Sequence, residues 1–216
     1  MRSENKPGAP EELSFIEKAR RAQLIACTIE TIAALGYGQA SLAQIAKRAG
    51  VSKGVISYHF KSKDELIEQT AAAIFEAFGA FMGPQIEAET TPRKKLEAII
   101  RSNLAFMQRH RQHLVALLEI LGNARPLPTL MAATHQASLC DLESFLRWGQ
   151  EVGEFREFAP SVMALVIRNA IDLAAGKIAS VEGFDADLYA NELVALFDRA
   201  ICLEKEVPSP RTSSCY

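Results

Sequence analysis

The sequence predicts an all-α protein with a small N-terminal head of three helices and a larger C-terminal helical bundle. Apolar residues recur at three- and four-residue steps along most of the 216 residues, which is the spacing of amphipathic helices. No segment alternates polar and apolar residues with a period of two, so we expect no strand. Capping residues, glycines and prolines divide the chain into helical segments.

The chain begins with an arm and one long helix. Residues 1–12 hold two prolines, a glycine and several charges, and we expect them to be disordered. From about Phe15 to Leu35 apolar residues recur at helical spacing, and Gly36 follows them. Glycine is the usual residue just beyond a helix end, so this segment predicts one amphipathic helix that braces the short helices after it.

Residues 41–66 predict two short helices that meet at a tight turn and lead into a third. Ser41 is a good N-cap, and Gln44 has the spacing of a capping box. Gly50 falls where the first helix must end, and Ser52 can cap the second. The inward side would carry Ile45, Ala46, Ala49, Val51, Ile56 and Phe60. Because the second helix otherwise carries small, polar or basic residues, the segment predicts a helix-turn-helix that places this helix in a DNA groove.

The run from Gln44 to Leu66, QIAKRAGVSKGVISYHFKSKDEL, resembles the DNA-binding domain of TetR-family transcriptional regulators. The resemblance covers about residues 15–66, and the rest of the chain matches that family only in length and helical character. It implies a DNA-binding domain over residues 13–62 and a helical effector-binding and dimerisation domain over 63–205. The Pro- and Ser-rich residues 206–216 are expected to form a disordered tail.

Positions in the second short helix predict base contacts. Lys53 would donate to guanine O6 or N7, Val55 would contact a thymine methyl group, and Gly54 would let the backbone come close. The candidate DNA-binding residues are Ser41, Ser52, Lys53, Gly54, Val55, Ser57, Tyr58, His59 and Lys63. The alternative is that they are ordinary solvated residues of a small helical bundle.

The resemblance assigns phosphate contacts to other members of this set. It implies that Tyr58, His59 and Lys63 contact DNA, mostly its backbone, and that Ser41 and its helix N-terminus form another phosphate site. The chain departs from the family pattern at Ser57, where a tyrosine usually contacts phosphate. A serine hydroxyl can donate there but reaches less far.

The remaining helices are expected at positions set by apolar stripes and by proline or capping residues. They run from Lys63 to Met82, with an end near Gly83-Pro84, from Pro92 to Met107, from Leu114 to Leu121, from about Leu127 to Glu151, from Pro160 to about Val181, and from Ala186 to Leu203. The helix from Lys63 joins the head to the body, so it can transmit movement between them.

The resemblance implies a pocket for a small-molecule effector in the body, and mostly apolar walls with a few polar groups suit one. The candidate lining residues are Phe78, Met82, Asn103, Phe106, Met107, Leu117, Leu121, His135, Ser138, Phe145, Trp148 and Asn169. Each of them also fits an ordinary core position. Asn103 and His135 are the stronger candidates, because polar groups on apolar stripes need partners, but a protein group or a buried water would serve equally well.

The last two helices are apolar on more than one face. Pairing with a second copy across a two-fold axis would bury the extra face in a four-helix bundle, and the resemblance implies such a homodimer. The candidate seam residues are Ala170, Leu173, Ala174, Leu193, Leu196, Phe197 and Ala200. The alternative is that this face packs inside the chain, against the long helix from Leu127.

Charge, cysteine spacing and apolar content indicate the partner and the cellular compartment of the protein. The formal net charge is −2, yet residues 1–65 hold an excess of Lys and Arg, which suits a head that meets phosphate. Four scattered cysteines without a CxxC spacing favour free thiols in a reducing compartment. We see no signal peptide and no membrane span, so we expect a cytoplasmic protein.

We expect neither a metal site nor an enzyme active site. His110 and His113 are three residues apart, a spacing that can bind metal, but no third ligand is in view. No nucleophile with its base, no phosphate-binding glycine loop and no paired carboxylates stand out, so we expect neither an enzyme nor a cofactor.

Together these features predict a homodimeric TetR-like regulator, most often a repressor, that binds double-stranded operator DNA. A small, largely apolar effector would release it. The alternative is a helical ligand- or protein-binding module that has lost operator binding, and Ser57 is the residue that favours it.

Overall fold

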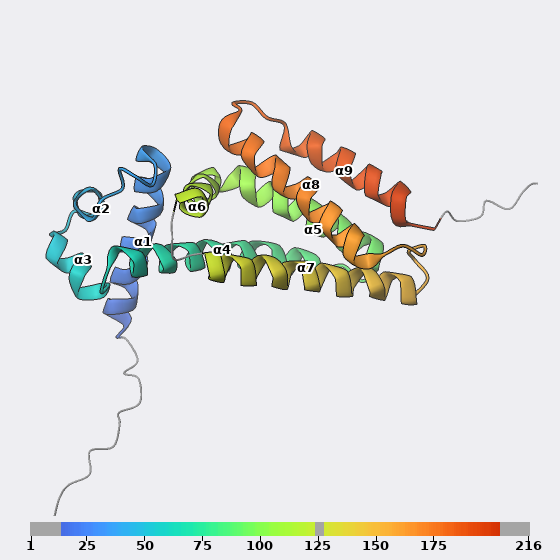
Figure 1. The fold of residues 1–216 in the computed structure, drawn as a ribbon, viewed down its shortest axis with the longest axis horizontal. Coiled ribbons are helices and arrows are strands. Elements are labelled where there is room, and N and C mark those ends of the chain that lie inside the picture. Colours follow the sequence, from blue (N-terminus) through green and yellow to red (C-terminus); the bar gives the residue numbers. More distant parts are fainter. Residues whose placement is uncertain (1–13, 124–127, 204–216) are drawn as a thin grey trace, which may run out of the picture. The chain divides into compact units, whose positions relative to one another are not determined.

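The computed structural model describes residues 14–123 and 128–203, except for the side chains of residues 128–137. The described residues form nine helices and no strand (Figure 1), so the predicted all-α class is confirmed. The helices are α1 (Phe15–Leu35), α2 (Leu42–Ala49), α3 (Lys53–His59), α4 (Lys63–Glu87), α5 (Pro92–Arg109), α6 (Arg111–Asn123), α7 (Pro128–Glu151), α8 (Pro160–Ser180) and α9 (Ala186–Ile201). The expected arm over residues 1–12 and tail over residues 206–216 lie outside the described residues.

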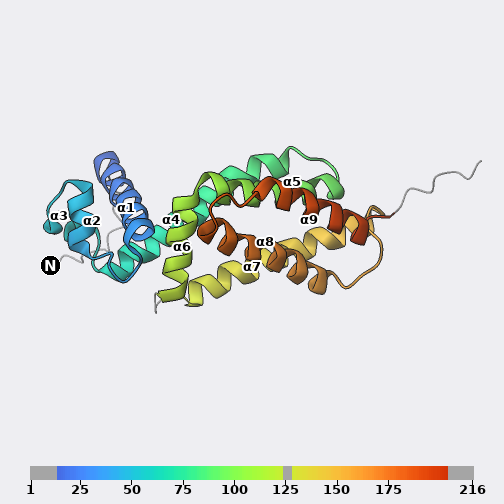
Figure 2. The same ribbon diagram turned by 90° about the horizontal axis from the view of Figure 1, so that it is seen from above.

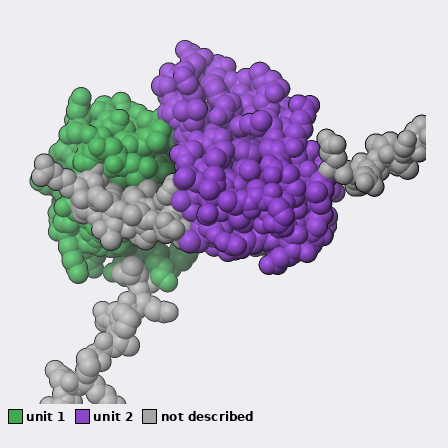
Figure 3. Space-filling model, turned by 45° about the vertical axis from the view of Figure 1, so that its right-hand side comes forward, with its two compact units in different colours: residues 1–76, 112–128 green, residues 77–111, 129–216 purple. Residues whose placement is uncertain are grey.

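The chain divides into two compact units, shown in different colours in Figure 3. The first, called the head here, holds the described residues up to Glu76 together with those from Gln112 to Pro128. The second, called the body, holds 77–111 and the described residues from Thr129 onward. The division falls inside α4, whereas the sequence placed the boundary at residues 62 and 63.

The core of the head lies between its first three helices. α1 packs against both α2 and α3, and α2 packs against α3. The buried cluster consists of Leu24, Ile45, Ala46, Ala49, Ile56, Phe60 and Leu66. Leu24 and Ile45 are wholly inaccessible to solvent, so these short helices are held by packing rather than by their own helix propensity.

Local signals in the sequence set the ends of the head helices. Ser14 and Glu17 form a reciprocal capping box at the start of α1. The Ser41 side chain accepts a hydrogen bond from the Gln44 N–H at the start of α2. Gly50 ends α2 with φ of 65°, a left-handed conformation that favours glycine. The tight turn between α2 and α3 depends on this residue.

Two expected helix boundaries in the middle of the chain were wrong. α4 does not end at Gly83 but continues through Pro84 to Glu87. Gly83 has no side chain to clash with the proline ring, and the Ala88 N–H again bonds to the Pro84 carbonyl. The expected gap between Met107 and Leu114 is also shorter: α5 extends to Arg109, and α6 begins at Arg111 after the single residue His110.

The body is built around α5, α8 and α9. α5 packs along α9 and also against α8, and α8 contacts α9 (Figure 2). The buried side chains of these helices are mostly aliphatic and include Leu96, Ile100 and Leu104 of α5, Ile167, Ile171, Ala174 and Ile178 of α8, and Ala190, Leu193 and Phe197 of α9.

Backbone pairing ties the end of α9 to the segment that precedes α8. The Arg156 N–H donates to the Ile201 carbonyl, and the Leu203 N–H donates to the Glu154 carbonyl. This pairing ends α9 at Ile201, two residues before the expected end. In the part of the chain that the structure describes, no helix is long and apolar enough to cross a bilayer.

Candidate DNA-binding surface

The helix α3 has one buried side and one exposed side. Ile56 and the C-capping Phe60 are 1% and 2% exposed, and they anchor the helix to the head core. The other side presents Ser52, Lys53, Gly54, Ser57 and Tyr58, which are all exposed, with Val55 half-buried beside them. Ser52 takes the N-cap position as expected, but its side chain makes no capping hydrogen bond.

Arg21 of α1 holds the C-terminal end of α3. Its guanidinium donates to the His59 carbonyl and, at 2.7 Å, to Oε1 of Gln69. It also forms an ion pair with Glu65 at 3.4 Å and lies 4.3 Å from the centre of the Phe60 ring. A cation at a helix C-terminus offsets the partial negative charge of the last carbonyls. Arg21 therefore fixes α3 against both α1 and α4.

The exposed polar side of α3 contains two groups that are held by contacts inside the head. The Ser57 hydroxyl donates to the Lys53 carbonyl at 3.3 Å, so in this rotamer its proton does not point away from the helix. The Tyr58 hydroxyl donates to Glu17 at 3.5 Å. Hydrogen bonds from Ser14 lower the pKa of the Glu17 carboxyl, which keeps this acceptor ionised.

A second group of candidate residues lies at the start of α4. The Lys63 ammonium stands 4.8 Å from the centre of the Tyr37 ring. The Tyr37 N–H donates at 2.9 Å to the Glu119 carboxylate of α6. Burial, with a smaller effect of Asp64, raises the pKa of the Tyr37 phenol. Ser41 is exposed at the start of α2, where helix N–H groups favour an anion.

Sequence reasoning did not find Arg21, Glu65 or Glu119. Their contacts join residues between 38 and 82 positions apart, and no local pattern marks such pairs.

Comparison with known proteins identifies this arrangement. Residues 24–70, which include α2 and α3, match the family model of bacterial regulatory proteins of the tetR family. The head is therefore similar to the DNA-binding region of tetR-family regulators over these residues.

Curated relatives show the same resemblance. The HTH-type transcriptional regulator BetI of Ectopseudomonas mendocina is 41% identical over 90 residues, which are 41% of this chain and 46% of that protein. BetI of Cronobacter sakazakii is 38% identical over 119 residues, 53% of this chain and 58% of that protein. The chain therefore matches about half the length of these relatives. Both relatives are named as transcriptional regulators.

Solved structures share the fold over most of the chain. A regulator from Saccharomonospora viridis in complex with choline aligns with a TM-score of 0.74 and 19% identity, over 87% of this chain and 100% of that one. The regulator FadR from Bacillus subtilis in complex with stearoyl-CoA aligns with a TM-score of 0.71 and 23% identity, over 81% and 96% of the two chains. At these identities the likeness shows the fold.

Part of the expected effector set gathers in an aromatic cluster of the body. The Phe78 and Phe106 rings lie 4.0 Å apart, and His110 stacks on Phe106 at 4.5 Å. Phe81, which was not predicted, packs edge-on against Phe106. Trp148 belongs to another aromatic contact of the body, with Phe145 at 6.1 Å.

The polar effector candidates bond within their own helices. The Asn103 amide is 3% exposed and donates to the Ile99 carbonyl at 2.9 Å, and Asn169 is exposed and donates to the Leu165 carbonyl. The His135 side chain lies outside the described residues.

The other effector candidates divide between the two units. Met82, Met107 and Ser138 are in the body, whereas Leu117 and Leu121 of α6 group with the head. Met107 and Leu117 are buried, Met82 and Ser138 are half-buried, and Leu121 is 41% exposed.

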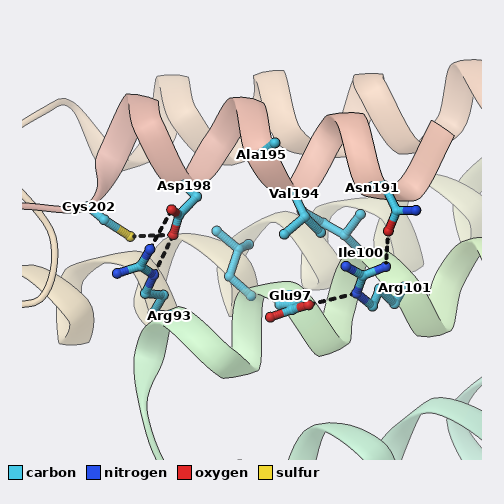
Figure 4. Close-up of a pocket in the computed structure, with 10 residues that line it drawn as sticks. Arg93, Glu97, Ile100, Arg101, Asn191, Val194, Ala195, Asp198 and Cys202 are labelled. Atoms are coloured by element: carbon cyan, nitrogen blue, oxygen red, sulfur yellow. Dashed lines mark hydrogen bonds and ion pairs between the residues drawn. The ribbon is translucent and has the colours of Figure 1, made fainter. Parts of the chain in front are cut away.

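A hollow of about 300 Å³ between α5 and α9 contains none of the predicted effector residues (Figure 4). Leu96, Ile100, Val194 and Ala195 are among its apolar lining. Its charged rim is internally paired: Arg93 bonds to Asp198 at 2.5 Å and Arg101 bonds to Asn191 at 2.6 Å. Arg101 also pairs with Glu97. These groups bridge α5 and α9 instead of facing an empty charged site.

The predicted seam residues of α8 and α9 differ in accessibility. Leu173 and Leu196 are 65% and 58% exposed, whereas Ala174, Leu193 and Phe197 are buried in the body. Ala170 and Ala200 are half-buried. Further exposed apolar residues on the two helices are Val162, Leu165, Val166 and Leu188.

The cysteines are free thiols in the described part of the chain. Burial and the hydrogen bond to Asp198 raise the pKa of Cys202 to about 12, and burial raises the pKa of Cys27. Within the same residues no group of three His, Cys, Asp or Glu side chains is placed to hold a metal ion.

Proposed function

We propose that this chain is a DNA-binding transcriptional regulator of the TetR type, and that it acts as a repressor that a small effector releases. The observation that carries the proposal is the exposed polar face of α3, held on the buried Ile56 and Phe60 within residues that match the tetR model. A short helix that is anchored to the head core on one side and exposed to solvent at its N-terminal end fits the major groove.

The residues of the α3 face divide into base and phosphate contacts. Lys53 at the first position of α3 reaches guanine, and Gly54 beside it lets the backbone approach. Tyr58, His59 and Lys63 contact phosphates and fix the register of the head on the duplex. Contacts of the second kind add affinity without sequence information.

Two substitutions separate these roles. Lys53→Ala should relax base preference at one operator position, at about 1–3 kcal/mol. Lys63→Ala should weaken binding to all sequences and reduce the salt slope by about one. Lys94→Ala, an exposed lysine of α5 in the body, is the matched control and should leave both quantities unchanged. Equal losses on operator and random DNA for Lys53→Ala would contradict its role as a base contact.

The operator-binding form is a homodimer. The exposed apolar side chains of α8 and α9, with Leu173 and Leu196 at the centre of the predicted seam, support a seam with a second copy. Burial of such a face is the usual basis of a two-fold interface. Two heads would then read half-sites about 34–36 Å apart, which is one turn of DNA.

The effector binds in the body. The aromatic cluster of Phe78, Phe81, Phe106 and His110 offers apolar surface, and the relatives with a similar fold hold choline and stearoyl-CoA. An aromatic surface accepts an acyl chain by burial and a quaternary ammonium by cation–π attraction.

Titration of the purified protein with these two probes, followed by Trp148 fluorescence, tests this site. Release of bound promoter DNA over the same concentration range supports an effector role. Binding without release of DNA would contradict it, because an effector must favour one state over the other.

The alternative is a helical ligand- or protein-binding module that has lost operator binding. The bond of the Ser57 hydroxyl to the Lys53 carbonyl favours it, because this serine, which stands where the family usually has a tyrosine, reaches less far toward a phosphate. A salt titration separates the two functions. An operator-binding head loses affinity for DNA steeply as the salt concentration rises. A ligand- or protein-binding module does not bind DNA at any salt concentration.

A further inference from the structure

We propose that Glu119 of α6 is a positioning residue for the phosphate-contacting edge of the head and acts through Tyr37 on Lys63. This inference rests on the proposed function, because it assigns a role in DNA binding. It begins from the hydrogen bond between the Tyr37 N–H and the Glu119 carboxylate, which is 2.9 Å long and joins residues 82 positions apart.

Glu119 stands against the turn that follows α1. Gly36 opens this turn with φ of 77°, and a Cβ atom at Gly36 would lie 3.4 Å from the Glu119 carboxylate oxygen. The positive φ at Gly36 is a conformation that glycine tolerates best, and the next N–H points at the Glu119 carboxylate. Hydrogen bonds with a charged partner are stronger than neutral ones, so the carboxylate holds the turn in place.

The Tyr37 ring connects the turn to Lys63. The Lys63 ammonium lies 4.8 Å from the ring centre, within the range of a cation–π contact. Lys63 is half-buried at the first position of α4, so few conformers are open to its side chain. A shift of the turn therefore moves the surface on which the ammonium rests.

Glu119 lies on a helix that connects directly to the candidate effector site. α6 begins at Arg111, directly after His110, and the His110 ring stacks on Phe106 of the aromatic cluster. The helix that carries Glu119 is thus joined through one residue to a helix of the candidate effector site. A movement of α6 would therefore change the position of Glu119, and through Tyr37 and Lys63 it would change the affinity of the head for DNA.

A double-mutant cycle on DNA affinity tests the inference with the full-length chain. Glu119→Ala should weaken binding to operator and random DNA alike, by roughly three- to tenfold, and reduce the salt slope by about one, as Lys63→Ala does. The double variant should bind no more weakly than Lys63→Ala alone, because both changes remove the same contact.

Three further variants make the cycle decisive. Glu119→Gln keeps an acceptor oxygen but loses the charge, and should bind with an affinity between those of the wild type and Glu119→Ala. Tyr37→Leu keeps the backbone donor but removes the ring, and should weaken binding as much as Glu119→Ala. Asn123→Ala removes the amide that donates to the Glu119 backbone carbonyl and is the control on α6, with no expected change in affinity.

The outcomes are separable. If the wild-type chain shows no salt-sensitive binding to DNA, the proposed function fails and this inference fails with it. If the wild type binds but the losses of Glu119→Ala and Lys63→Ala multiply in the double variant, the inference alone is overturned. A Glu119→Gln variant that binds as weakly as Glu119→Ala would overturn it as well.

Discussion

Removal of the Arg21 guanidinium should destabilise the head by about 2–3 kcal/mol. The side chain is 17% exposed and makes three polar contacts, to His59, Glu65 and Gln69, in addition to its contact with the Phe60 ring. A hydrogen bond that involves a charged group contributes about 1.5–3 kcal/mol, and a cation–π contact about 0.5–1 kcal/mol. These values are not additive, and solvent screens the pair with Glu65. Arg21→Met keeps the apolar stem, so the loss is that of the polar contacts.

Urea unfolding followed by circular dichroism measures this loss, with Trp148 fluorescence as a reporter in the body. With a slope of about 1–3 kcal/mol per molar, the midpoint of the head should fall by roughly 1 M. Arg20→Met is the matched control, because Arg20 bonds only to Gln23 on the surface in the described structure. If Arg21→Met and Arg20→Met unfold within about 0.5 kcal/mol of each other, Arg21 does not anchor α3.

Three further predictions concern separate parts of the molecule. Gly50→Ala should destabilise the head by about 1–2 kcal/mol in the same urea assay, because φ of 65° strains a residue with a Cβ atom. Leu173→Glu together with Leu196→Glu should convert the proposed dimer to monomer in sedimentation, and an unchanged mass would contradict the seam. Cys202 should react with iodoacetamide at pH 8 far more slowly in the folded chain than in urea, because its pKa of about 12 keeps the thiol protonated. Since this folded-state pKa lies above the unfolded value, its contribution to the free energy of unfolding is complete below about pH 8.5 and falls as pH rises toward 12.

The sequence predicted the elements of the head well because their signals are local. Ser41 caps α2, Gly50 ends it, and Ile56 and Phe60 alternate with exposed residues at helical spacing. Each of these signals lies within four residues of the structure that it specifies, so no knowledge of the rest of the chain is needed. The start of α8 at Pro160 was predictable for the same reason.

Features that depend on tertiary contacts were missed or misplaced. α4 continues through Pro84 although proline usually ends a helix. Ala174, Leu193 and Phe197 were candidates for a seam, with packing inside the chain as the alternative, and they are buried within the single chain. A stripe of apolar residues shows that a helix face is covered, but it does not show whether the cover is the same chain, a second copy or a ligand.

The positioning contacts of the DNA-binding surface were not predictable from residue type. Arg21 and Glu119 look like ordinary solvated charges in a helical stretch, and only their distant partners distinguish them. The grouping of the aromatic cluster was not predictable either. Phe78 and Phe106 are separate effector candidates in the sequence, and Phe81 is not among the candidates.

The most direct test of the account is DNA binding by the full-length protein as a function of salt. Fluorescence anisotropy with a duplex from the region upstream of the coding sequence, and with a random duplex of equal length, gives both affinity and specificity. We expect tighter binding to the upstream duplex and a linear fall of the logarithm of the binding constant with the logarithm of salt concentration. The absence of a salt-sensitive complex with either duplex would contradict the central claim.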